Sequence, residues 1–209
     1  MFDLNQLLIY AGVVLLLMLV PGPAVLLTLA RSMSGGARVG IATGAGIAIG
    51  DALHTLAAVV GLSAILMTSS LAYEAVKYLG AAYLIYLGVV ALWERAGSVD
   101  VPKLQAVDAR RAFRQAIFIE ILNPKTALFF LSFLPQFTNA SHGPIWAQLL
   151  VLGGIFVALS IAYTSLLSVC AASVSRWLKG NSTLGRWGNK IVGGTYIALG
   201  VQLALQERR

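Results

Sequence analysis

The stretch ILNPKTALFF, residues 121–130, places Asn123, Pro124 and Lys125 inside a long apolar segment. Proline lacks a backbone donor and interrupts a helix, and asparagine followed by proline is a favoured helix start. A lysine within an apolar run needs a polar partner or water, because an isolated buried charge is strongly unfavourable. The stretch therefore predicts an interrupted helix whose second half begins after Asn123, with a charge at the junction.

The remainder of the chain has the composition of a membrane protein. Of its 209 residues, 58% are hydrophobic and only 11% are charged, whereas about 25% of residues in a soluble domain are charged. About 20 apolar residues span a bilayer core. The uncharged runs approach or exceed that length at 4–30, 52–73, 78–93, 126–175 and 191–206. We therefore expect an all-α, multi-pass protein embedded in the lipid bilayer.

Six transmembrane spans are expected in a single domain, residues 1–209. They lie at roughly 5–30, 39–68, 72–94, 112–137, 145–175 and 188–206. A five-span alternative lays the third or the sixth segment on the membrane surface. Asp3, with no basic residue before the first apolar run, argues against a cleavable signal peptide.

The basic residues predict the orientation in the membrane. Eleven of the fifteen Lys and Arg residues fall in three predicted loops, around 31–38, 95–114 and 176–190. Cytoplasmic loops carry the excess of positive charge. Both termini are therefore expected outside the cytoplasm, and the loop at about 95–112 inside it.

The two halves, about 1–95 and 112–209, resemble each other. KYLGAAY at 77–83 matches KIVGGTY at 190–196, and Gly22-Pro23 corresponds to Asn123-Pro124. Three spans per half make the halves enter the membrane from opposite sides. This 3+3 inverted repeat, with the first and fourth helices broken at proline, is a common plan in secondary transporters.

The broken helices predict a binding site near the middle of the membrane. Counted from the nearest loop arginine, Pro23 lies about 12 Å deep, Lys125 about 17 Å and Asp51 about 20 Å. Helix starts at Pro23 and Pro124 would both present free N–H groups, which attract a carboxylate. The candidate substrate-binding residues are Pro21, Gly22, Pro23, Asp51, Asn123, Pro124 and Lys125.

Each of these features also has a structural interpretation. Proline kinks are common in membrane helices, and Lys125 and Asp51 could form an ion pair. Glu120 is expected to snorkel or to pair with Arg114, with proton uptake as the alternative. His54, one turn from Asp51, could relay protons or form an interior hydrogen bond. Asp51, Glu120 and His54 are thus the candidates for proton coupling.

Other classes of function fit the sequence less well. Basic residues confined to short loops argue against a nucleic-acid partner. Two histidines, one cysteine and two deep carboxylates are few ligands for a metal ion. The sequence contains no recognisable P-loop and no nucleophile–base pair. Neither an ATP-driven pump nor an enzyme is therefore expected, and no cofactor is implied. An exporter of another solute and an accessory membrane subunit are the alternatives.

Three stretches together resemble the LysE/RhtB family of amino-acid exporters: PGPAVLLTLARS from Pro21, GAGIAIGDALHTLAAVVGL around Asp51, and AFRQAIFIEILNPKTALFFLSFLPQF around Lys125. The resemblance covers almost the whole chain. It implies a bacterial inner-membrane protein that exports an amino acid or a close derivative by proton antiport. Threonine, homoserine, lysine, arginine and leucine are among the family's substrates. Glu120 and Ala24 depart from the expected pattern, which leaves the substrate open, and an oligomer is compatible with the sequence.

Overall fold

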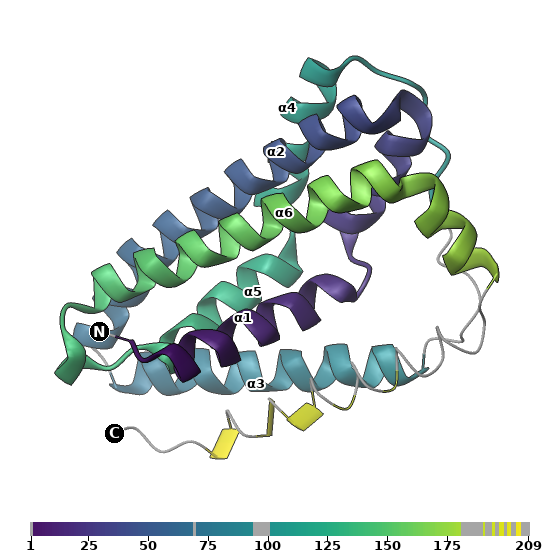
Figure 1. The fold of residues 1–209 in the computed structure, drawn as a ribbon. Coiled ribbons are helices and arrows are strands. Elements are labelled where there is room, and N and C mark those ends of the chain that lie inside the picture. The colour runs from purple at the N-terminus through teal and green to yellow at the C-terminus, as the bar shows by residue number, and fades with distance from the viewer. Residues whose placement is uncertain are drawn as a thin grey trace.

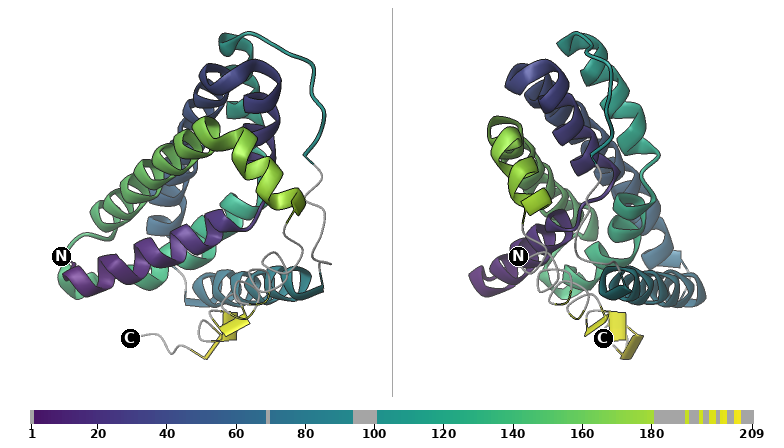
Figure 2. Two further views of the ribbon diagram at one scale, coloured as in Figure 1. Left: turned by 45° about the vertical axis from the view of Figure 1, so that its right-hand side comes forward. Right: turned by 90° about the vertical axis from the view of Figure 1, so that its right-hand side faces the viewer.

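The computed structural model describes residues 2–68, 70–93 and 101–180, together with residues 190, 194, 197, 198, 200, 201, 204 and 205. Within these residues every regular element is a helix and no strand occurs. The helices lie as an open bundle in which α2 and α6 run side by side (Figures 1 and 2). The expectation of an all-α protein is thus confirmed.

The first helix of the chain is followed by a break. Helix α1, Leu4–Leu19, begins at Asp3, whose side chain accepts a hydrogen bond from the Gln6 N–H. The chain leaves helical geometry at Val20 and resumes in α2, Pro23–Thr68. Gly36, with φ 78° and ψ 175°, divides α2 into two helices. Figure 1 shows the first of them turning back at this point into the long helix beside α6.

A second break separates α4 from α5. Helix α4, Ala109–Ile121, is capped by Asp108, and α5, Pro124–Phe133, is capped by Asn123. The two helices, taken to Phe137, are bent by 50° at this junction. Two short 3-10 helices, η1 at Leu134–Phe137 and η2 at Ala140–His142, lead into α6, Ile145–Gly180.

Glycines on two faces of α2 allow its close packing. A Cβ on Gly44 would overlap Thr164 of α6, and one on Gly40 would lie 2.7 Å from the Ser168 hydroxyl. On another face, a Cβ on Gly50 would lie 2.5 Å from the Glu120 Cβ of α4. The backbones therefore approach closely, as small residues in membrane helices permit.

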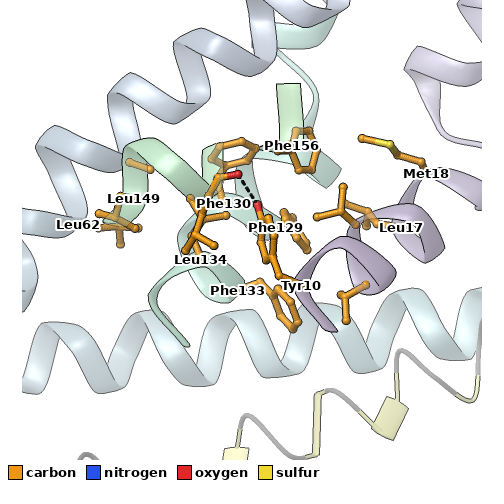
Figure 3. Packing of buried hydrophobic residues seen from close by; sticks show 14 of the residues in the cluster. Tyr10, Leu17, Met18, Leu62, Phe129, Phe130, Phe133, Leu134, Leu149 and Phe156 are labelled. Atoms are coloured by element: carbon orange, nitrogen blue, oxygen red, sulfur yellow. Dashed lines mark hydrogen bonds between the residues drawn. The ribbon is translucent and has the colours of Figure 1, made fainter. Parts of the chain in front are cut away.

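An aromatic cluster joins α1, α5 and α6 (Figure 3). The Phe130 and Phe156 rings meet edge to face with centroids 4.8 Å apart, and Phe129 packs on both. The buried Tyr10 hydroxyl donates a 3.0 Å hydrogen bond to the Leu152 carbonyl. Helix α3, Ser70–Trp93, lies along α5 on the side away from α6 (Figure 1).

The described helices account for part of the expected set of spans. Segments of α2 and α6 are each long and apolar enough to cross a bilayer, and the bent α4–α5 pair makes a third if it is one span. Helix α1 and the Tyr78–Val90 part of α3 are apolar but shorter. The expected sixth span, 188–206, lies mostly outside the described residues.

The segment before α4 is anchored to the bundle. Arg31 is buried, and its guanidinium donates 2.7 Å hydrogen bonds to the Gln105 carbonyl and to the Gln115 side chain. Val101 is buried against apolar residues of α2 and α6, and Leu104 packs on the same cluster. The end of this connection is thus part of the packed fold.

Candidate functional site

A cavity of about 50 Å³ lies where the two breaks approach α6. At about 10–15 Å³ per water, it has room for a few water molecules. Its walls come from α1, the break after it, α2, the α4–α5 junction and α6. The lining residues are Leu17, Met18, Gly22, Ala24, Val25, Ile47, Asp51, Glu120, Asn123, Lys125, Thr126, Phe156, Ser160, Tyr163 and Thr164.

Asp51 is the most distinctive polar group in the cavity wall. It is only 1% exposed, and its Oδ2 atom has no hydrogen-bond partner within the described part of the chain. Its carboxyl lies within hydrogen-bonding reach of both the Glu120 carboxyl and the Ser160 hydroxyl. A buried carboxylate oxygen strongly favours a donor or a proton. Asp51 can therefore receive an ammonium group in the cavity.

Glu120 does not snorkel. It is 1% exposed, and its carboxylate accepts hydrogen bonds from the Asn123 side-chain amide at 3.1 and 3.2 Å. The Thr126 hydroxyl donates a further bond of 2.5 Å. The break after Ile121 turns these donors back toward the last turn of α4. The sequence position of Glu120 does not show this bend, and it therefore suggested that the side chain reaches the membrane interface. Glu120 thus belongs to the cavity with Asp51.

His54 holds the same junction from α2. Its Nε2 lies 2.9 Å from the Glu120 backbone carbonyl oxygen. A carbonyl oxygen only accepts, so Nε2 carries the hydrogen in this contact. His54 therefore makes the interior hydrogen bond that was one of its two expected roles, and this bond goes to the backbone of Glu120 rather than to its carboxylate.

Lys125 crosses from α5 to the end of α1. Its ammonium donates hydrogen bonds of 2.7 Å to the carbonyl oxygens of Leu17 and Val20. In a continuous helix the Leu17 carbonyl would accept from the N–H of residue 21, but Pro21 has none. The cation also lies at the negative end of the α1 dipole, where positive charge is stabilised.

Gly22 provides the space for this side chain. A Cβ at Gly22 would lie 3.2 Å from the Lys125 Cδ and 3.5 Å from its Nζ. Pro21 frees a carbonyl, Gly22 leaves room and Lys125 supplies the donor. The two motifs predicted to converge therefore do so through a direct contact.

The two helix starts at the cavity differ. The Asn123 side chain accepts from the Lys125 N–H, so α5 carries its own cap. At the start of α2, Gly22 has no side chain to cap the N–H groups of Ala24 and Val25, and both of these residues line the cavity. An anionic group is thus better accommodated at the start of α2.

The structure brings most of the predicted residues to one place. Gly22, Asp51, Glu120, Asn123 and Lys125 line the cavity; Pro21, Pro23 and Pro124 shape the breaks beside it, and His54 braces one of them. Sequence reasoning missed Thr126 and Phe156. Thr126 follows Lys125 directly, and its hydroxyl one turn from the helix start was the available signal, whereas Phe156 looks like any core aromatic.

Hydroxyl groups of α6 complete the polar wall. Ser160, Tyr163 and Thr164 line the cavity. The Thr164 hydroxyl donates to the Ser160 carbonyl at 2.7 Å, and Ser168 repeats this bond one turn later. Among the described residues, no three His, Cys, Asp or Glu side chains form a group that could hold a metal ion.

Comparisons with known proteins place the chain in a family. The LysE type translocator family profile matches residues 15–207. An uncharacterised membrane protein of Pseudomonas aeruginosa is 34% identical over 198 residues, which cover 92% of this chain and 91% of that protein.

Two further relatives carry a functional name. The homoserine/homoserine lactone efflux protein of Salmonella typhimurium is 34% identical over 190 residues, 90% of this chain and 91% of the relative. Its namesake from Salmonella typhi is 33% identical over the same shares. No solved structure matches the chain. These names indicate a transporter of small solutes rather than an enzyme. The chain is a membrane-embedded member of the LysE-type translocator family.

Proposed function

We propose that this protein is a secondary exporter of a small amino acid, of the homoserine class, and that it works by proton antiport in the bacterial inner membrane. The observation that carries the proposal is the unpartnered, buried Oδ2 of Asp51 in the wall of a cavity between two interrupted helices. Such midplane breaks are the usual substrate sites of secondary transporters.

The proposed architecture has six spans in two inverted halves. Helix α1 and the first part of α2, up to Gly36, form one broken span, and α4 with α5 forms its counterpart. The second part of α2, α3, α6 and the segment at 188–206 supply the others. The placement of the basic residues favours periplasmic termini.

The cavity offers complementary groups for both ends of an amino acid. The substrate ammonium would bind Asp51 Oδ2. The substrate carboxylate would lie at the uncapped N–H groups of Ala24 and Val25, where the helix dipole is positive. A cavity of about 50 Å³ would have to widen around any amino acid, and it would widen least around one with a short side chain. Homoserine lactone has the amine but no free carboxylate, so it would rely on Asp51 alone.

Proton coupling would arise from the pair of carboxyls. Two ionised carboxylates side by side repel strongly in a low dielectric, and Lys125 compensates only one negative charge. Either a proton or the substrate ammonium can compensate the other. Export would then proceed with substrate on the pair, and return with a proton in its place.

Purified protein in liposomes tests the proposal. With the pH gradient as the only driving force, labelled homoserine should move toward the acidic side, and serine or threonine should compete more strongly than lysine. Equal transport after the pH gradient and membrane potential are collapsed would contradict antiport. Absence of transport across a panel of amino acids and other small solutes would contradict the exporter itself.

Reporter fusions test the orientation. A reporter that is active only in the cytoplasm should be active when inserted near residue 105 and silent when fused after residue 209. An active fusion at residue 209 would contradict the six-span arrangement and favour five spans.

A further inference from the structure

The outer face of α4 carries a second surface with its own chemistry. A groove beside the start of the helix is lined by Asp108, Arg110, Arg111, Arg114, Gln115 and Phe118. The three arginines are exposed, and Phe118 is 67% exposed. The Asp108 carboxylate already accepts from the Arg111 N–H as the helix cap. The groove is therefore strongly basic.

The same face becomes apolar along the helix. Arg111, Arg114, Phe118 and Leu122 follow one another at intervals of three or four residues, which places them on one stripe. Leu122, at the end of the stripe, is 78% exposed. The opposite face of α4, with Ala112 and Ala116, is buried. A stripe with cations at one end and large apolar groups at the other is amphipathic along the helix axis.

The length of the stripe matches one leaflet of a bilayer. From Arg111 to Leu122 the rise is about 16 Å at 1.5 Å per residue. Half of a hydrocarbon core of about 30 Å is about 15 Å. Guanidinium groups at headgroup depth bind phosphate in a forked geometry. With Arg111 and Arg114 at that depth, Phe118 and Leu122 would lie at the depth of the acyl chains.

We propose that this groove binds an anionic phospholipid from the leaflet at the N-terminal end of α4. Arg110, Arg111 and Arg114 hold the headgroup phosphate, and Phe118 and Leu122 contact an acyl chain. A soluble phosphate would use only the first half of this surface. A zwitterionic lipid would match its shape but compensate less of its charge, so an anionic lipid is the ligand that fits both ends.

The test measures lipid binding by the full-length protein in neutral detergent, by native mass spectrometry with dioleoyl-phosphatidylglycerol or dioleoyl-phosphatidylcholine. Wild type should prefer the anionic lipid. Each Lys or Arg near an anionic surface contributes about a fivefold gain in affinity, so Arg111→Gln with Arg114→Gln should weaken binding roughly 30-fold. The control pair Arg38→Gln with Lys103→Gln removes the same charge from exposed positions outside the groove and should bind as wild type does.

A second variant distinguishes a lipid from a free anion. Phe118→Ser should weaken phosphatidylglycerol binding and leave any binding of glycerol 3-phosphate unchanged. Equal loss of lipid binding in the Arg111/Arg114 variant and in the Arg38/Lys103 variant would reduce the effect to net charge and overturn the proposal. The proposal would also be overturned if a second copy of the chain occupied this surface. The protein would then be a dimer that Arg111→Gln with Arg114→Gln dissociates, while lipid binding stays the same.

Discussion

The Lys125 ammonium lies 2.7 Å from the Leu17 carbonyl oxygen, which Pro21 leaves without a helical donor. This contact links the C-terminal end of α1 to the N-terminal turn of α5. The ammonium carried by one interrupted helix therefore stabilises the end of the other. Lys125 thus has backbone partners at the end of α1 that the sequence did not indicate. A change at either motif should therefore be felt at the other.

Gly22→Ala tests that link from the side of α1. The added Cβ would lie 3.2 Å from the Lys125 Cδ, so the lysine side chain has to move by a few tenths of an ångström while its ammonium is bonded to two carbonyl oxygens. Overpacking of this kind typically costs about 1–3 kcal/mol. We expect export to fall at least severalfold while the protein remains in the membrane. Gly12→Ala, where a Cβ would meet nothing within 4 Å, is the matched control and should export normally.

Lys125→Met keeps the apolar stem of the side chain and removes the ammonium. The carbonyls of Leu17 and Val20 lose their donor, so we expect export in liposomes to be abolished or severely lowered. Adding Asp51→Asn to this variant should not restore flux, because an asparagine at position 51 does not replace the ammonium donor at the end of α1. Near-normal flux in the double variant would instead reduce Lys125 and Asp51 to a structural ion pair.

Glu120→Gln tests whether proton coupling can be lost while substrate transport continues. The glutamine can still accept from the Thr126 hydroxyl, but the pair with Asp51 then has a single ionisable carboxyl. We expect the variant to exchange labelled for unlabelled homoserine while a pH gradient no longer drives accumulation. Accumulation equal to that of wild type would remove Glu120 from proton coupling.

Arg31→Ala tests the anchor of the segment before α4. The substitution leaves the Gln105 carbonyl and the Gln115 side chain without their charged donor. Hydrogen bonds to charged groups contribute about 1.5–3 kcal/mol each. We expect a lower midpoint of thermal unfolding in detergent, whereas Arg38→Ala, at an exposed position, should leave the midpoint unchanged. Equal midpoints for the two variants would mean that the anchor contributes no stability.

Local rules predicted much of this arrangement from the sequence. Asn123 followed by Pro124 indicated the start of α5, and Gly22 followed by Pro23 indicated the start of α2. Both depend on residues adjacent in the chain or one turn apart. The expectation that Glu120 snorkels to the interface was wrong, because its donors Asn123 and Thr126 reach it only after the chain bends.

The partner of Lys125 could not be predicted either. It depends on a carbonyl more than a hundred residues away, exposed by a proline that looked like a simple kink. The 3+3 inverted repeat remains a prediction, and most of its second copy of the matched motif, KIVGGTY at 190–196, lies outside the described residues. Contacts across the two breaks can be predicted only when the three-dimensional path of the chain is known.

The central claim is that Asp51 binds the substrate ammonium. Equilibrium binding of labelled homoserine to the purified protein tests it directly, with wild type compared with Asp51→Asn. Asp3→Asn is the matched control, because asparagine caps a helix as well as aspartate does and Asp3 lies at the exposed start of α1. We predict that wild type and Asp3→Asn bind homoserine alike and that Asp51→Asn loses binding while staying folded. Unchanged binding by Asp51→Asn would contradict the account.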